Sequence, residues 1–330
     1  MRKRDLQSAP DLEEQPADLG QEATDSEPGP GVQSPVVLHG ALSVLGNRVV
    51  DQSGKPPQLR GVSFAWSNWW GAFWKASTVS WLVDDWKVDI VRAAMGIEPT
   101  GAYLSSPTTE RAKVIAVVDE AIKRGIYVII DWHDHNAPKN IDAARAFFIE
   151  MATLYGSYPN VIYEIFNEPE GETWPQIKAY ATDIITNIRA IDPDNLIVVG
   201  TPSWSQGVDQ AAANPVPGQN IAYALHFYAA THKQWLRDRT AAAIASGIAI
   251  FVTEWGVCEA SGGGYLDHKE TEAWLSFMAT HKLSWANWSI SNKLDQTCAL
   301  VQPHADPTGG WPASSLTTAG ILMREKLRAY

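Results

Sequence analysis

Short stretches typical of β-strands alternate with helical patterns from Val36 to the end of the chain, and this alternation constrains the fold most. Eight stretches rich in β-branched and aromatic residues predict strands. Their predicted cores are Leu59–Ser63, Ile90–Met95, Ile126–Asp131, Ile162–Phe166, Leu196–Gly200, Ile221–Leu225, Ile250–Thr253 and Trp285–Trp288. Eight strands that alternate with helices favour a closed (β/α)8 barrel, the TIM barrel of the α/β class, over an open doubly wound sheet. The glycine-rich dinucleotide-binding motif of open sheets does not follow the first strand.

The segments between the strands carry helix signals. Apolar residues of 114–122 share one helical face, Thr109 is a candidate cap for that helix, and Gly125 ends it. Apolar residues of 177–188 repeat the spacing before Pro193 ends the segment. Both segments are typical of the helices that cover a parallel sheet.

The chain before the first barrel strand divides into two parts. Residues 1–35 combine many acidic residues and several prolines with few large apolar residues, which predicts a disordered acidic tail. Residues 42–51 predict a β-hairpin with a Gly46-Asn47 turn that closes the bottom of the barrel. We therefore expect a tail over 1–35 and a single barrel domain, with its small hairpin, over 36–330.

Composition excludes several classes of function. The chain of 330 residues has a formal net charge of −11, which disfavours nucleic acid and anionic lipid as partners. It lacks an apolar run of about eighteen residues that could cross a membrane. The fifteen tryptophans exceed what a core of this size requires, so some are expected to be exposed for stacking. A neutral polymer is a partner that this composition allows.

Polar and aromatic side chains follow the predicted strands at the points where the strands end. Because the carboxyl ends of barrel strands meet at one rim, these side chains are expected to converge there. They are Trp66, Asn68, Trp69, Trp70, Arg92, Trp132, His133, His135, Asn167, Glu168, Trp204, His226, Tyr228, Glu254, Trp255, Trp288, Asn292 and Lys293. Two carboxylates, several imidazoles and many indoles would thus share one site.

The fourth strand ends at Asn167-Glu168-Pro169. Proline has no N–H to donate and keeps the residue before it out of the helical region, so Glu168 is expected in an extended conformation at the strand tip. Taken alone, the tripeptide could equally be a turn with a solvated carboxylate. Glu164, four residues earlier, is expected deeper in the barrel.

Two carboxylates at one rim are what glycoside hydrolysis requires, one as a proton donor and one ionised to attack or to activate water. Arg92 and Tyr228 could keep one of them ionised, and indole faces suit sugar rings. The alternative is a metal site made from His133, His135, His226 and a carboxylate. A role for these histidines beside the carboxylate pair accounts for the same residues.

The motifs at the strand ends also resemble a known family. Over about residues 40–330 the chain is similar to glycoside hydrolase family 5, most closely to its bacterial endo-β-1,4-glucanase (cellulase) branch. The matching motifs are Val91-Arg92, Asp131-Trp132-His133-Asp134-His135, Ile165-Phe166-Asn167-Glu168-Pro169, His226-Phe227-Tyr228, Val252-Thr253-Glu254-Trp255-Gly256 and Asn287-Trp288-Ser289. The barrel of 36–330 would then be a glycoside hydrolase catalytic domain.

The resemblance implies a role for each matching residue. Glu168 would be the general acid/base, Glu254 the nucleophile, and Asn167 a ligand of the sugar's 2-hydroxyl. The residues expected to orient the two carboxylates are Arg92, His133, His226 and Tyr228. The residues expected to line the glucan cleft are Trp69, His135, Trp204, Trp288 and Lys293. One departure is Ala65, which stands near a position where many members carry a sugar-contacting histidine; Trp66 or Asn68 could cover that gap.

Further expectations follow from the resemblance. The family retains anomeric configuration, so the two carboxyl groups should lie about 5–5.5 Å apart. We expect a secreted monomer that acts on β-1,4-glucan without a cofactor and without a nucleic-acid or membrane partner. Other β-1,4-glycans, namely mannan, xylan and mixed-linkage glucan, remain alternatives. A non-catalytic carbohydrate-binding barrel would need one catalytic carboxylate to be missing, and both are present.

The two cysteines and the N-terminus bear on the compartment. Cys258 follows the seventh strand and Cys298 the eighth, and these strands are neighbours in a closed barrel, so a disulfide between their loops is a reasonable hypothesis. Such a bridge would favour an oxidising compartment. The start of the chain is basic, as in a signal peptide, but no apolar region follows it.

Overall fold

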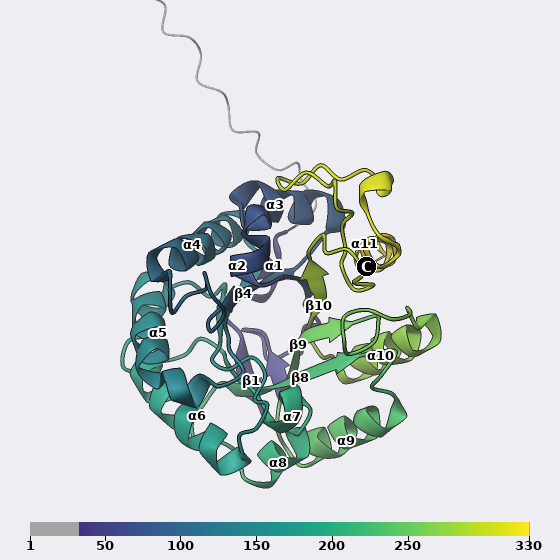
Figure 1. Cartoon of the computed structure of the whole chain (residues 1–330). Helices are drawn as coiled ribbons and strands as arrows, with labels where there is room; N and C mark the ends of the chain where they lie inside the picture. Colours follow the sequence, from purple (N-terminus) through teal and green to yellow (C-terminus); the bar gives the residue numbers. More distant parts are fainter. Residues whose placement is uncertain (1–32, 330) are drawn as a thin grey trace, which may run out of the picture. The chain divides into compact units, whose positions relative to one another are not determined.

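A computed structural model describes residues 33–329, and within them eight parallel strands close into a barrel in chain order (Figure 1). The strands are β3 (Arg60–Phe64), β4 (Ile90–Gly96), β5 (Tyr127–His133), β6 (Val161–Glu164), β7 (Ile197–Val199), β8 (Ile221–Tyr228), β9 (Ile250–Gly256) and β10 (Trp285–Ile290). β10 pairs with both β9 and β3, which completes the ring. The predicted TIM barrel is confirmed, whereas the predicted tail lies outside the described residues except for its last three.

Helices form the outer layer of the barrel (Figure 1). The longer ones are α3 (Ala76–Trp81) with the π-helix η2 (Leu82–Trp86), α4 (Pro107–Arg124), α5 (Ile141–Tyr155), α6 (Trp174–Arg189), α8 (Val208–Ala213), α9 (Gln234–Ala245), α10 (His268–His281) and α11 (Thr318–Arg328). Shorter helical pieces are α1 (Pro35–His39), α2 (Ser67–Trp70), η1 (Gly71–Phe73), η3 (Ala137–Asn140), α7 (Pro202–Ser205) and η4 (Ala313–Ser315). α2 and α7 follow the carboxyl ends of β3 and β7, where the predicted site lies.

The start of α4 differs from its prediction, while its end is confirmed. The helix begins at Pro107 after Ser106, so Thr109 lies inside its first turn and does not cap it. Proline suits the first helical position because its fixed φ is already helical and its missing N–H would have no partner there. Gly125 ends the helix in the left-handed conformation, with φ of 66°.

The predicted hairpin is present and closes the bottom of the barrel. β1 (Ser43–Leu45) pairs antiparallel with β2 (Arg48–Val50) across the Gly46-Asn47 turn. Leu42 and Val49 are buried in one cluster with apolar residues of the barrel strands, and Figure 1 shows β1 across the ring of strands. The hairpin therefore acts as the floor of the barrel.

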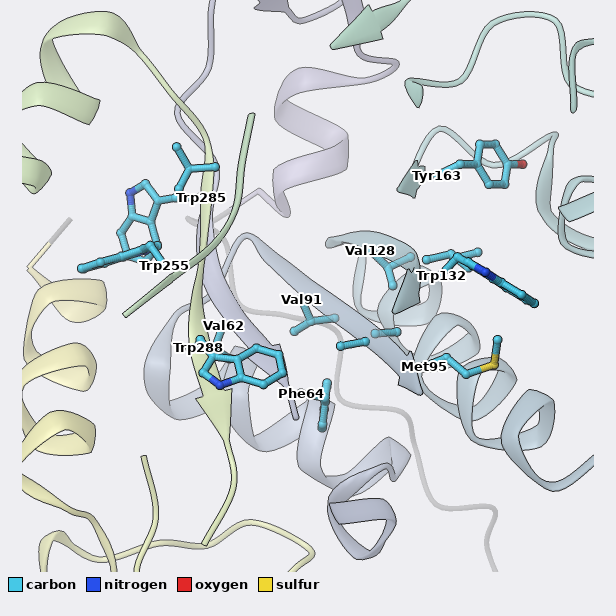
Figure 2. Packing of buried hydrophobic residues seen from close by; sticks show 14 of the residues in the cluster. Val62, Phe64, Val91, Met95, Val128, Trp132, Tyr163, Trp255, Trp285 and Trp288 are labelled. Carbon is cyan, nitrogen blue, oxygen red and sulfur yellow. The ribbon is translucent and has the colours of Figure 1, made fainter. Parts of the chain in front are cut away.

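Strand alternation separates the outer core from the barrel interior. Val62, Val91 and Val128 are in register on neighbouring strands and belong to the same apolar cluster as residues of α4 (Figure 2). The residue after Val91 is Arg92, which by alternation points to the opposite side, into the barrel. Trp255 and Trp285 add an edge-to-face pair at 5.5 Å on the helix side. The apolar residues on the helix side thus hold the strands in place, while Arg92 lies on the inner side of the same sheet.

Two further features concern the compartment. Cys258 and Cys298 form a disulfide between the loops that follow β9 and β10, as hypothesised from the sequence. In the described part of the chain, each helix is too short or too polar to span a membrane.

Candidate active site

The two carboxylates predicted to catalyse the reaction face each other at the carboxyl rim. Glu254 lies in β9, and Glu168 lies just beyond β6. An oxygen of Glu168 lies within 4.8 Å of an oxygen of Glu254. This short separation matches retaining glycosidases, at about 5–5.5 Å, and not inverting ones, at about 6.5–9.5 Å.

Glu254 is held by two donors. The Tyr228 hydroxyl donates to Oε1 at 2.6 Å, and Nη1 of Arg92 donates to Oε2 at 2.8 Å. Burial and the charge of Glu168 raise the pKa of Glu254, whereas Arg92 and His226 oppose that rise by their positive charges. The two donors fix the carboxylate and leave it poised beside Glu168.

Glu168 lies between two imidazoles. Nδ1 of His226 is 3.0 Å from Oε1, and Nε2 of His135 is 3.5 Å from Oε2. Burial raises the pKa of Glu168, but its interactions with His135 and His226 outweigh burial and lower the pKa to about 2. The Nε2 atom of His226 also lies 2.8 Å from Oγ1 of Thr253, which fixes the ring. The two imidazoles therefore favour the ionised form of Glu168 over its protonated form.

Asn167 presents an unused donor to the site. Its Oδ1 accepts a hydrogen bond from Nη2 of Arg92 at 2.7 Å, while its buried Nδ2 has no partner among residues 33–329. Buried polar groups are nearly always satisfied, so such a donor is suited to a hydroxyl of a bound ligand.

His133 and His135 have contacts that differ from those expected of them. His133 was expected to orient a carboxylate of the catalytic pair, but its Nδ1 contacts Asp131 at 2.7 Å and its ring stacks on Trp288 at 5.3 Å. His135 was expected to line the cleft, but it lies beside Glu168. The reason is local: β5 ends at His133, so strand alternation no longer sets the direction of His135.

The expected aromatic residues surround the pair at different depths. Trp69 and Trp204 are 56% and 45% exposed, whereas Trp288 is buried. Lys293 is exposed in the loop after β10. A cavity of about 400 Å³ lies beside Glu168, and Trp204 forms part of its wall. The exposed indole of Trp204 thus provides a flat apolar face for a ligand ring in this cavity.

A short left-handed turn carries Trp204. Ser203, Trp204 and Ser205 have φ of 59°, 54° and 56°. The backbone N–H of Trp204 donates to the carbonyl of Pro169 at 2.9 Å, and Oγ of Ser205 donates to the carbonyl of Asn167 at 2.8 Å. The turn therefore fixes the segment that carries Glu168 as well as the indole.

Comparison with known proteins identifies the family. Residues 50–294 match the model of the cellulase family, glycosyl hydrolase family 5. The chain belongs to glycosyl hydrolase family 5. It is 47% identical over 301 residues to Endoglucanase N of Pectobacterium atrosepticum, covering 90% of this chain and 67% of the relative. It is 51% identical over 256 residues to Endoglucanase Z of Dickeya dadantii, covering 76% and 60%.

Solved structures of the same family are also similar. The catalytic domain of a Thermobifida fusca endoglucanase superposes with a TM-score of 0.86 at 37% identity, covering 90% of this chain and all of that domain. A variant of that domain was solved in complex with cellotetraose. This family 5 chain spans about two thirds or less of the length of the curated relatives named above.

Trp66, the residue after the departure from the usual family 5 pattern at Ala65, packs against two histidines of the site. The Trp66 ring lies edge-on to His133 at 4.3 Å and stacks on His135 at 5.5 Å with an interplanar angle of 28°. Trp66 rather than Asn68 thus contacts the two histidines. This contact keeps both imidazoles packed at the rim.

Sequence reasoning missed several polar residues of the site. Asp131 contacts His133, Thr253 contacts His226, and Glu98 lies 3.7 Å from Nδ1 of His135. Asp131 and Thr253 stand inside the family motifs, so their position was a usable signal. Glu98 follows β4 outside any of these motifs, so the sequence contained no signal for it.

The alternative metal site is not assembled as proposed. Among the described residues, the group close enough to share an ion is Glu168, His226 and Glu254. His133 and His135 are not part of that group. The histidine set of the metal hypothesis therefore does not converge.

Proposed function

We propose that the protein is an endoglucanase that hydrolyses β-1,4-glucosidic bonds with retention of configuration, with Glu168 as acid/base and Glu254 as nucleophile. The observation that carries this proposal is the pair of facing carboxylates with different partners. Tyr228 and Arg92 orient Glu254, while two imidazoles flank Glu168. Family membership and the names of the relatives support the same substrate class.

In the first step, a Glu254 oxygen attacks the anomeric carbon as the glycosidic bond breaks. Glu168 gives its proton to the departing oxygen, and a covalent glycosyl-enzyme forms. Arg92 and Tyr228 hold the attacking carboxylate in place, so little reorganisation is needed. The free amide N–H of Asn167 would bind the 2-hydroxyl, a contact that strengthens in the transition state.

In the second step, ionised Glu168 takes a proton from water while the water oxygen attacks the anomeric carbon. The bond to Glu254 breaks, and the sugar leaves with its original configuration. The short carboxylate separation leaves no room for the water molecule that an inverting mechanism needs between carboxylate and sugar. The same residue thus serves as acid and then as base.

Substrate binding is assigned to the exposed aromatic residues. Trp69 and Trp204 offer flat faces, with Trp288 beneath the rim and Lys293 at its edge. A related catalytic domain binds cellotetraose, which supports a β-1,4-linked glucan as ligand. Mannan, xylan and mixed-linkage glucan are the alternative substrates, since all pass through a similar transition state.

We also propose that the protein is secreted and acts as a monomer. The Cys258–Cys298 disulfide supports an oxidising compartment, and a polymeric glucan is an extracellular substrate. The monomer proposal is supported by the fact that one chain supplies both carboxylates, their donors and the aromatic residues.

The proposed function is tested by release of reducing sugar from carboxymethylcellulose. Wild-type protein should release it, and Glu168→Gln and Glu254→Gln should each lose at least about a thousandfold in rate, or about 4 kcal/mol of transition-state stabilisation. The matched control is Glu170→Gln, because this exposed carboxylate is only two residues from Glu168.

Release from mannan or xylan but not from carboxymethylcellulose would move the proposal to that glycan. Unchanged rates in the two active-site variants would reject the assigned roles. A folded wild-type protein inactive on all of these glycans, yet able to bind cellotetraose, would support the binding-protein alternative.

A further inference from the structure

The environment of His135 is unlike that of a residue that binds sugar. Its Nε2 lies 3.5 Å from Glu168, and its Nδ1 lies 3.7 Å from Glu98, so both ring nitrogens face carboxylates. Trp66 stacks on the ring plane at 5.5 Å. Each polar atom and one face of this imidazole are thus already engaged by the protein.

Glu98 is built into this arrangement. One of its oxygens accepts from the backbone N–H of His135 at 3.3 Å, and the other accepts from Nδ2 of Asn136 at 3.0 Å. Its side chain is 29% exposed, and that of His135 is 27% exposed. Glu98, His135 and Glu168 therefore form a row of alternating charges that leads from the edge of the molecule to the catalytic pair.

We propose that His135, held between Glu98 and Glu168, is a positioning residue that acts on the reaction through the charge of Glu168 and not through the sugar. The inference rests on the acid/base role proposed for Glu168. As an imidazolium it favours the carboxylate form of Glu168, which the second step requires, and it opposes the protonated form, which the first step requires.

The surrounding charges agree with this reading. Burial lowers the pKa of His135, but Glu168 and Glu98 outweigh burial and raise the pKa to about 10. Burial likewise raises the pKa of Glu98, but its bonds with His135 and neighbouring groups lower the pKa to about 2. Each group is therefore held in its charged form.

Other ionisable groups also face this row. Asp134 lies beside Glu98, and burial raises the pKa of Asp134 to about 7. The His133 ring is 6.3 Å from the His135 ring. The groups around Glu168 itself, or next to its partner carboxylate, are His226, His232, Tyr228, Glu254 and Arg92. His226 supplies a second positive charge, so loss of His135 should shift Glu168 without abolishing its ionisation.

The sign of the effect of His135→Gln follows from Coulomb's law. Removing a cation near a carboxylate raises the pKa of that carboxylate, by about one unit or more at this distance. The acid form of Glu168 then persists to higher pH. For cellotetraose, the basic limb of kcat/KM should move up by about one pH unit.

Two aryl-substrate measurements separate this effect from a loss of structure. With 2,4-dinitrophenyl β-cellobioside the leaving group needs no proton, so the basic limb of kcat/KM should not move up in His135→Gln. The acidic limb of kcat for this substrate, which reports Glu168 as base in the second step, should move up by a similar amount. Glu98→Gln removes the anion beside Nδ1 of His135, so it should move the titration of His135 to lower pH.

A measurement independent of activity is the protonation state of the imidazole by nuclear magnetic resonance. The His135 signal, identified by its absence in His135→Gln, should be that of an imidazolium at pH 8, and Glu168→Gln should make it neutral at that pH or move its titration to lower pH. Exposed His304→Gln is the control and should leave both pH profiles unchanged.

A neutral His135 at pH 8 would overturn the inference, as would unshifted limbs in folded His135→Gln. If His135→Gln does not fold, His135→Asn replaces it in the pH profiles and in the identification of the imidazole signal. An inactive wild type would reject the proposed function, whereas the imidazole spectrum would still test the charge of His135.

Discussion

Arg92 connects more groups of the site than any other side chain described above. It is completely buried and lies 2.7–2.9 Å from oxygens of Glu164, Asp131 and Glu254. It also donates to Asn167. Burial lowers the pKa of Arg92, but the three carboxylates outweigh burial and raise it. A single cation thus holds three buried carboxylates together and also orients the side chain of Asn167.

We expect Arg92→Met to destabilise the protein strongly, because it leaves buried carboxylates without their cation. The free energy of unfolding should fall by about 3–5 kcal/mol, measured by urea denaturation with tryptophan fluorescence. The control is Arg111→Met, since Arg111 pairs with Glu150 at the surface and should cost less than about 1 kcal/mol. Equal losses in the two variants would contradict the structural role of Arg92.

At the scale of single residues, the sequence predicted which residues belong to the site better than it predicted what they contact. Glu168, Glu254, Arg92 and Tyr228 lie as expected because each is carried by a strand or its tip. His135 follows the end of β5, and its direction depends on Glu98 and Trp66, which belong to other loops. Contacts between loops are not encoded in a strand pattern, so the contacts of His135 could not be foreseen.

The left-handed turn of Ser203–Ser205 is the most strained element near the site. A non-glycine residue in this region costs roughly 1–2 kcal/mol, and three occur in succession. Strain of this kind persists where surrounding structure enforces it, and here the bonds to Pro169 and Asn167 do so. The turn lowers the stability of the fold, but it fixes the Trp204 indole and the segment that carries Glu168.

Ser203→Gly should therefore raise the unfolding free energy by about 0.5–1 kcal/mol, after the entropic cost of glycine is counted. A looser turn should also lower kcat/KM on cellotetraose severalfold. Lys87→Gly is the matched control, because Lys87 has φ of 62° after η2, away from the site. It should gain stability without losing activity; a loss in kcat/KM equal to that of Ser203→Gly would count against the role of the turn.

Element boundaries were predictable where the chain itself sets them. All eight strands were found because runs of β-branched residues mark them, and Gly125 marked the end of α4. β6 ends at Glu164, two residues before the predicted end, although the N–H groups of Ile165 and Asn167 still donate to the carbonyls of Val198 and Trp132. β8 continues to Tyr228 because Phe227 and Tyr228 still pair with β9. A pairing partner, not propensity, thus fixes the end of β8.

At the scale of the whole molecule, the disulfide joins the loop after β10 to the loop after β9, the strand that carries Glu254. Cys258 lies four positions after Glu254 in sequence, and the bridge closes a loop of 40 residues. A Cβ atom built on Gly256 would lie 2.6 Å from Sγ of Cys298 and 2.4 Å from the Tyr228 ring. The bridge is therefore packed against the backbone beside the residue that binds Glu254.

Replacing both cysteines by alanine should lower the unfolding free energy by about 4 kcal/mol, the entropy expected for a loop of this size. Thermal unfolding with and without dithiothreitol measures the same effect in the wild type. Thiol titration of the denatured, unreduced protein should find no free thiol, because both cysteines are bridged. Finding two thiols would remove the bridge and the argument for an oxidising compartment.

Ring closure also sets the order in which the enzyme can be assembled during synthesis. β3 pairs with β10, so one edge of the sheet has no neighbour until more than 200 residues after β3 have been made. Contacts between such distant segments form slowly and only late. Glu168 follows β6 and Glu254 lies in β9, so the two carboxylates reach their final positions only after β10 has left the ribosome and the ring has closed. We therefore expect a shorter nascent chain to lack the assembled site.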